Sequence, residues 1–131
     1  MHAGPGVGRV FGGSTKSDVS GTLMSASSHN LFGAGVNGQT LTAAANQIGS
    51  PSVPIDPKLE ALADNGGATW THKLENDSPA IDAADAVIVY ESLYDQRRSL
   101  RFDDGNGDAL VGLDIGAFEL TADEYFEGIG A

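Results

Sequence analysis

The sequence predicts a mainly β protein with little helix, and two features of residues 1–55 lead to that expectation. This segment is rich in Gly, Ser, Thr, Ala and Asn, which is poor helix material and suits short strands joined by tight turns. A pattern of one or two apolar residues followed by Gly also recurs. It appears at Val10-Phe11-Gly12, Leu31-Phe32-Gly33 and Ile48-Gly49, with glycines 21 and 16 residues apart. These spacings are near the length of one solenoid coil, and the alternative is a chance pattern in a Gly-rich loop region.

Charge divides the 131-residue chain into two chemically different parts. Residues 1–55 carry Arg9, Lys16 and Asp18, a net charge of +1, whereas the chain from Asp56 onward has 17 acidic against five basic residues, a net of −12. The change in composition predicts a boundary between candidate solenoid coils over residues 1–55 and a different unit over residues 56–120, here called the cap segment. A frayed tail is expected over residues 121–131.

The overall charge and composition exclude several classes of partner. A formal charge of −11 argues against nucleic acid and anionic membrane surfaces, because both would repel the protein. Cysteine is absent, so disulfides and thiolate metal sites are ruled out. No segment approaches the roughly 18 apolar residues that insertion into a membrane requires, and residues 1–6 do not resemble a signal peptide. Cations and neutral or basic polymers fit better as partners.

The first half of the cap segment is expected to begin with a helical turn and continue as an extended chain. Asp56–Leu62 has Asp as a candidate N-cap and Pro at the first helical position. Residues 64–67 (Asp-Asn-Gly-Gly) predict a turn with positive φ, and residues 68–72 are expected to be extended. Trp70, the single tryptophan, is interpreted as a packing residue.

Alternating apolar residues over 111–118 predict a half-buried strand near the end of the cap. Asp114 lies within this strand, so its carboxylate needs a hydrogen-bonded partner. Arg97 is the candidate, because a planar guanidinium holds a carboxylate with two bonds. We therefore expect Arg97 to form a structural pair with Asp114, Asp82 or Glu119.

Four segments occur in an order that carries a family resemblance. They are Leu62–Gly67 followed by Thr71-His72, then Ser78–Ala83, then Asp95-Gln96-Arg97, and finally Asp114–Glu119. This series resembles the C-terminal region of secreted proteins with a choice-of-anchor Q domain, which have a right-handed parallel β-helix of the pectin-lyase-like fold. The resemblance covers roughly residues 14–120, and residues 18–33 resemble the last regular coil of these proteins.

The resemblance implies a function as well as a fold. The expected protein is a non-catalytic structural module: the terminal coils and irregular cap of a bacterial, adhesin-like parallel β-helix, extracellular or at the cell surface. Its partner would be the remainder of a longer β-helix chain. No nucleophile elbow, zinc-protease motif or phosphate loop occurs, so no residue is assigned a catalytic role.

Residues 103–108 (Asp-Asp-Gly-Asn-Gly-Asp) carry the strongest chemical signal in the chain. Asp104, Asn106 and Asp108 place oxygen atoms at alternating positions, with Asp103 beside them, as at the start of a calcium loop. The rest of a helix-flanked calcium loop does not follow, since Ile115 stands where a bidentate Glu is needed. The two interpretations are a calcium site and an acidic solvated turn.

Two alternative functions follow from other residues. In the first, Trp70, Tyr90 or Tyr94 form a glycan-binding surface for a surface polysaccharide, with an aromatic face and a polar rim. In the second, the chain is the remnant of a calcium-dependent polysaccharide lyase-like β-helix. An arginine among residues 97–101 beside the acidic loop would then act on a sugar next to its carboxylate.

Overall fold

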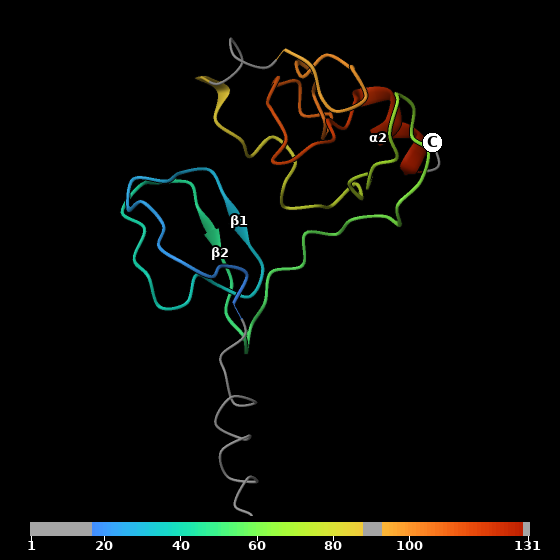
Figure 1. The fold of residues 1–131 in the computed structure, drawn as a ribbon. Coiled ribbons are helices and arrows are strands. Elements are labelled where there is room, and N and C mark those ends of the chain that lie inside the picture. The colour runs from blue at the N-terminus through green and yellow to red at the C-terminus, as the bar shows by residue number, and fades with distance from the viewer. Residues whose placement is uncertain (1–16, 88–92, 130–131) are drawn as a thin grey trace, which may run out of the picture.

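The computed structural model describes residues 17–87 and 93–129. Its elements are β1 (Leu31–Phe32), β2 (Gln47–Ile48) and the helix α2 (Ala122–Gly128). Most of the described chain is irregular, which confirms the expectation of little helix. Figure 1 shows two parts: residues 17–55, here called the coil region, form a wide loop that brings β1 and β2 side by side, and residues 56–129, the cap region, form a separate folded part that includes α2.

The coil region stacks one segment of chain on another, and the register of the paired strands has an offset of 16 residues. β1 and β2 pair in parallel, with Leu31 opposite Gln47 and Phe32 opposite Ile48. Three hydrogen bonds outside the strands keep the same offset. They run from Leu23 N to Gln39 Oε1, from Asn30 N to Asn46 Oδ1 and from Ala34 N to Asp18 Oδ2. The distance of 16 residues between Gly33 and Gly49 is therefore a stacking distance in the structure.

Small and amide side chains allow these segments to approach closely. A Cβ atom added to Gly49 would overlap the carbonyl oxygen of Gly33, so only glycine fits there. Asn46 joins the segments through its side chain, which accepts from both nitrogens of Asn30 and donates to the carbonyl of Ser27 at 2.7 Å. Side-chain amides thus satisfy backbone groups in a region with little buried apolar surface.

The cap region begins with a chain that folds back on itself over residues 59–74. The predicted turn at residues 64–67 is present: Gly66 and Gly67 have φ angles of 94° and 82°, and the Asp64 carboxylate accepts from the Gly66 N–H at 3.1 Å. Antiparallel bridges flank this turn. They pair Leu59 with Leu74 and Ala63 with Thr71.

The helical turn expected over residues 56–62 does not form. Asp56 does accept from the backbone of Lys58 at 2.8 Å, as an N-cap residue would. Lys58 then adopts a φ of 52°, which turns the chain out of a right-handed helix. The next residues bond across to residues 73–75 instead, so tertiary pairing overrides the local capping signal.

The apolar core lies in the cap region. It consists of Leu74, Ala80, Phe118 and Leu120, with Leu31 of the coil region packed against it. Beside this core, residues 111–118 are not the half-buried strand that their alternation predicted. Adjacent Leu113 and Asp114 are both buried, and Gly116 has a φ of 123°, so the chain bends and loses the period of two.

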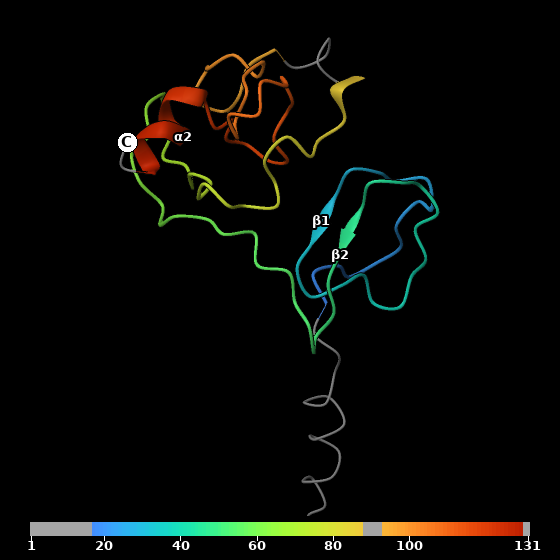
Figure 2. The same ribbon diagram turned by 180° about the vertical axis from the view of Figure 1, so that it is seen from behind.

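The tail is ordered through Ile129, whereas the sequence led us to expect a frayed end. Thr121 is the N-cap of α2, and a complete capping box joins its hydroxyl and backbone to Glu124. Glu124 also pairs with Arg97, which anchors this short helix to the cap. Figure 2 shows from behind that α2 lies against the cap region and away from the coil region.

Candidate functional site

The cap region contains a buried cluster of charged residues centred on Arg97, whose side chain is only 5% exposed. Its Nε donates to Asp95 at 2.8 Å, Nη1 to Glu124 at 2.7 Å and Nη2 to the backbone carbonyl of Glu119 at 2.6 Å. The guanidinium carbon lies 3.6 Å from the centre of the Phe118 ring. One face of the guanidinium therefore packs on Phe118, and its three nitrogens join the segments that contain Asp95, Glu119 and Glu124.

The carboxylates that hold Arg97 differ from those expected. The sequence predicted Asp114, Asp82 or Glu119, but the side-chain partners are Asp95 and Glu124. Asp95 is favoured because it starts the turn that contains Arg97 and also accepts the Arg97 backbone N–H at 2.7 Å. The pattern Thr121-x-x-Glu124 is a capping-box signal that could have located α2 from the sequence, but the pairing across 27 residues has no local signature.

Asp114 and Glu119 are fully buried and lie next to each other. The Asp114 carboxylate accepts from the backbone of Asp82 at 2.8 Å and of Leu120 at 2.6 Å. Burial raises the pKa of Asp114 to about 6. Burial and the neighbouring Asp114 charge raise the pKa of Glu119 to about 8, against the weaker effect of Arg101, whose Nε lies 3.4 Å from it.

Asp82 is not the ion-pair partner that the sequence predicted. Its backbone has a φ of 51°, and its carboxylate lies against Gly112, where an added Cβ would collide with it. Within the described residues, neither carboxylate oxygen has a hydrogen-bond partner. Burial, followed by the charges of Asp104 and Asp108, raises the pKa of Asp82.

The acidic loop at residues 103–108 turns its oxygen atoms toward its own backbone. Asp104 accepts from the N–H groups of Gly107 and Asp108 with one oxygen and from Ala109 with the other. Asn106 also accepts from Asp108, and Asp103 accepts from the first residue of α2. In residues 17–87 and 93–129 no three His, Asp or Glu side chains are grouped so that they could hold a metal ion. Calcium binding at Asp103, Asp104, Asn106 and Asp108 stays a prediction.

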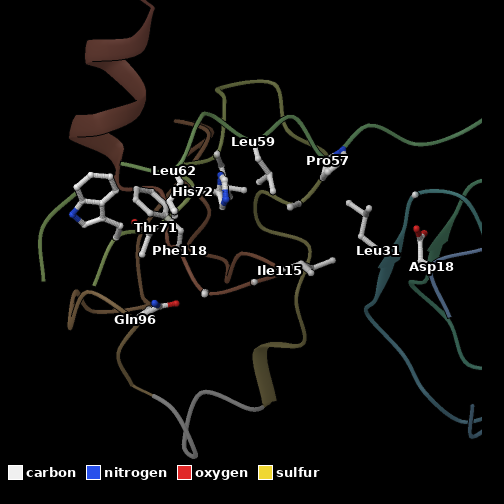
Figure 3. A pocket seen from close by; sticks show the side chains of 16 residues that line it. Asp18, Leu31, Pro57, Leu59, Leu62, Thr71, His72, Gln96, Ile115 and Phe118 are labelled. Atoms are coloured by element: carbon white, nitrogen blue, oxygen red, sulfur yellow. The ribbon is translucent and has the colours of Figure 1, made fainter. Parts of the chain in front are cut away.

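A cavity of about 540 Å³ lies between the coil region and the cap region and is lined by residues of both. Figure 3 shows Leu31 and Asp18 on the coil side, with Leu59, Ile115 and Phe118 toward the cap side. Trp70 also lines the cavity and is 62% exposed, so the interpretation of Trp70 as a packing residue is wrong. Large apolar side chains are left in contact with solvent here.

The polar side chains around this cavity already have partners inside the protein. His72 Nδ1 lies 2.7 Å from the Glu60 carbonyl, and the Gln96 amide donates to Thr69 at 2.7 Å. Tyr94 is 54% exposed but does not line the cavity, and Tyr90 lies outside the described residues. The predicted set of three aromatic residues is therefore not brought together at this cavity.

The three arginines near the acidic loop differ in their surroundings. Arg97 is enclosed, and Arg101 donates to the Asp114 carbonyl at 2.7 Å. Arg98 is exposed on a turn with a φ of 69°. Arg97 and Arg101 donate hydrogen bonds that join segments of the cap region, and a lyase-like role for these arginines stays a prediction.

No match to this chain is found among protein-family models, curated proteins or solved structures. Across the described ranges, no helix has the length and apolar character needed to cross a membrane. Any functional conclusion must therefore come from the stacked segments, the buried charges and the cavities.

Proposed function

We propose that this protein is a non-catalytic structural module: the last coil and the cap of a right-handed parallel β-helix that is extracellular or at the cell surface and adhesin-like. The observation that carries the proposal is the offset of 16 residues in the coil region. Strand pairing and three hydrogen bonds outside the strands share it. A constant offset between parallel segments is the property that allows identical coils to stack.

The chemistry of the cap region supports the same role. Its buried charged groups bond to one another and to the backbone, as Arg97 does with Asp95, Glu124 and Glu119. Such a cluster fixes one arrangement of an irregular chain that has few strands or helices to hold it. A unit that is folded and highly charged suits the end of a solenoid, where it discourages edge-to-edge growth.

The offset can be tested by lengthening the coil region. Duplicating residues 31–46 directly after Asn46 adds one complete offset, so the inserted residues fall into the same register and the cap should attach as before. Duplicating only residues 31–38 at the same place adds half of the offset. The side-chain amides and glycines of neighbouring segments should then no longer lie opposite their partners. We expect the first variant to keep the melting temperature of the natural chain and the second to lose it. Equal melting temperatures in the two variants would remove the proposal.

A second candidate function, binding of a neutral or basic glycan, is favoured by one observation: Trp70 is 62% exposed beside an apolar cavity. Aromatic faces at such sites can contact the apolar faces of sugars. Trp70→Ala should abolish retention on a polysaccharide array while leaving the melting temperature within about 1 °C, because an exposed side chain contributes little to folding. Trp70→Phe is the matched control. If the natural chain is not retained on the array, glycan binding is ruled out and the structural role is the remaining proposal.

A further inference from the structure

A second cavity, of about 340 Å³, also lies between the two regions. Ser28, His29 and Asn30 line it from the coil region, and Ala84, Asp85, Arg101 and residues 114–116 line it from the cap region. The Nδ1 atom of His29 is buried and has no hydrogen-bond partner among the described residues, and it lies 3.9 Å from Asp85 Oδ2. An imidazole and a carboxylate thus face each other across the boundary, just beyond hydrogen-bond distance.

Both side chains are held in place by their own region. His29 has a φ of 55°, and the next residue, Asn30, is bonded to Asn46 through backbone and side chain. Asp85 accepts from the backbone of Val87 with its other oxygen at 2.9 Å, and Ala84 donates to the Leu113 carbonyl at 2.8 Å. A left-handed backbone at a residue other than Gly or Asn is uncommon and is retained only where the surroundings fix it.

The other charged groups of the cavity are engaged elsewhere. Arg101 donates to the carbonyls of Asp114 and Gly116 and pairs with Glu119, and the Asp114 carboxylate accepts two backbone N–H groups. Among the carboxylates of this cavity, Asp85 is therefore the one with an oxygen that can accept a hydrogen bond from His29. Few other polar contacts cross the boundary: in the described ranges, the hydrogen bond that joins the two regions is the one from Gln47 Nε2 to the Pro79 carbonyl, at 2.6 Å.

We propose that His29 and Asp85 form a pH-sensitive clamp between the coil region and the cap region. When the imidazole takes up a proton, both ring nitrogens become donors and the ring gains a positive charge. The buried Nδ1–H then donates a charge-assisted hydrogen bond to Asp85. This bond strengthens a boundary that few hydrogen bonds cross. When the proton leaves, the two regions are held by Gln47 and by the contacts of Leu31. Acidification therefore tightens the attachment of the cap, a property beyond the structural role proposed above.

The test is a double-mutant cycle on the full chain at pH 5.5 and pH 8.0, with thermal unfolding as the measurement. His29→Asn keeps a residue that tolerates the left-handed backbone, and Asp85→Asn keeps the acceptor for Val87. At pH 5.5 each single variant should lower the melting temperature by about 1–4 °C, with no further loss in the double variant. At pH 8.0 the coupling should vanish. Titration of Asp114 and Glu119 is common to all four proteins and cancels in the cycle.

A second pair in the cap region provides the matched control. Lys58 and Asp77 form an ion pair, and Lys58 also has a left-handed backbone, with a φ of 52°. An ammonium group does not titrate between pH 5.5 and 8.0. The cycle of Lys58→Asn and Asp77→Asn should thus give the same coupling at both values. Coupling between His29 and Asp85 that is equal at both pH values, or absent at pH 5.5, would overturn the clamp.

For the natural chain, molar salt should lower the melting temperature more at pH 5.5 than at pH 8.0, and the reverse would also contradict the clamp.

Discussion

The coil region and the cap region are held together by different forces. In the coil region, side-chain amides, backbone groups and the Asp18 carboxylate bond between neighbouring segments, and Val36 is its one buried large apolar residue within the described ranges. In the cap region, ionisable side chains are buried beside Leu74, Phe118 and Leu120. The coil region therefore depends on the close approach of backbone segments, whereas the cap region depends on buried charged groups beside an apolar core.

The cap should be the more sensitive region to the loss of one charge. Arg97→Ala leaves Asp95 buried without its cation, so we expect a loss of about 3–5 kcal/mol in the free energy of unfolding. Urea denaturation monitored by circular dichroism measures this loss of stability. Arg98→Asn is the control, because Arg98 is exposed and Asn tolerates its left-handed backbone. If the two variants are equally stable, the buried cluster does not hold the cap together.

The pH dependence of stability should also arise in the cap region. Because the pKa of Glu119 is raised to about 8 from its ordinary value of 4.5, the folded protein favours the protonated form. The stability from this proton is fully present below about pH 4.5 and is lost as the pH rises through 8. Burial also raises the pKa of Asp114, to about 6, so its proton contributes stability that is lost as the pH rises through 6.

Glu119→Gln should remove most of the alkaline part of this loss, an effect on the order of a few kcal/mol between pH 5 and pH 9. Thermal unfolding at unit steps of pH would show it, with the exposed Glu127→Gln as the control. A melting temperature of the natural chain that rises between pH 6 and pH 9 would mean that Glu119 is ionised in the folded protein over this whole range.

The coil region should respond to shape rather than to charge. Gly49→Ala places a methyl group against the Gly33 carbonyl, and the resulting separation of the segments should cost about 1–3 kcal/mol. Gly38→Asn is the control, since nothing lies within 4 Å of a Cβ there and Asn tolerates its φ of 74°. Hydrogen exchange should show faster exchange at Gln47 and Gly49 with the cap unchanged. Exchange that increases across both regions would mean that they unfold as one unit.

The smallest expected effect concerns the acidic loop. Asp104→Ala removes the acceptor of three backbone N–H groups and should lower the melting temperature only slightly, with or without calcium, because these hydrogen bonds are exposed to solvent. Calorimetric calcium titration decides between the two interpretations of residues 103–108. Heat of binding and a higher melting temperature in millimolar calcium, both lost in a variant with Asp104→Ala and Asp108→Ala, would establish the site. The exposed Asp123→Ala is the control.

Two features, one in each region, could be predicted from the sequence because glycine marks both of them. The 16-residue separation of Gly33 and Gly49 is visible in the sequence, and the structure uses it as a stacking offset. The turn at residues 64–67 forms as expected, since Gly has no Cβ to prevent a positive φ. In both cases glycine is the residue that the backbone requires: at Gly66 because of a positive φ, and at Gly49 because the carbonyl of Gly33 approaches closely.

The partners within the cap were decided only by the tertiary structure. Arg97 could be recognised as a buried cation in need of acids, but 17 acids follow residue 55 and nothing local ranks them. The choice of Asp95 and Glu124, the exposure of Trp70 and the meeting of His29 with Asp85 depend on how distant irregular segments pack. The sequence alone determined a low-helix, Gly-rich coil region and an acidic cap. Packing set the pairings, because the energy of a buried charge depends on its three-dimensional surroundings.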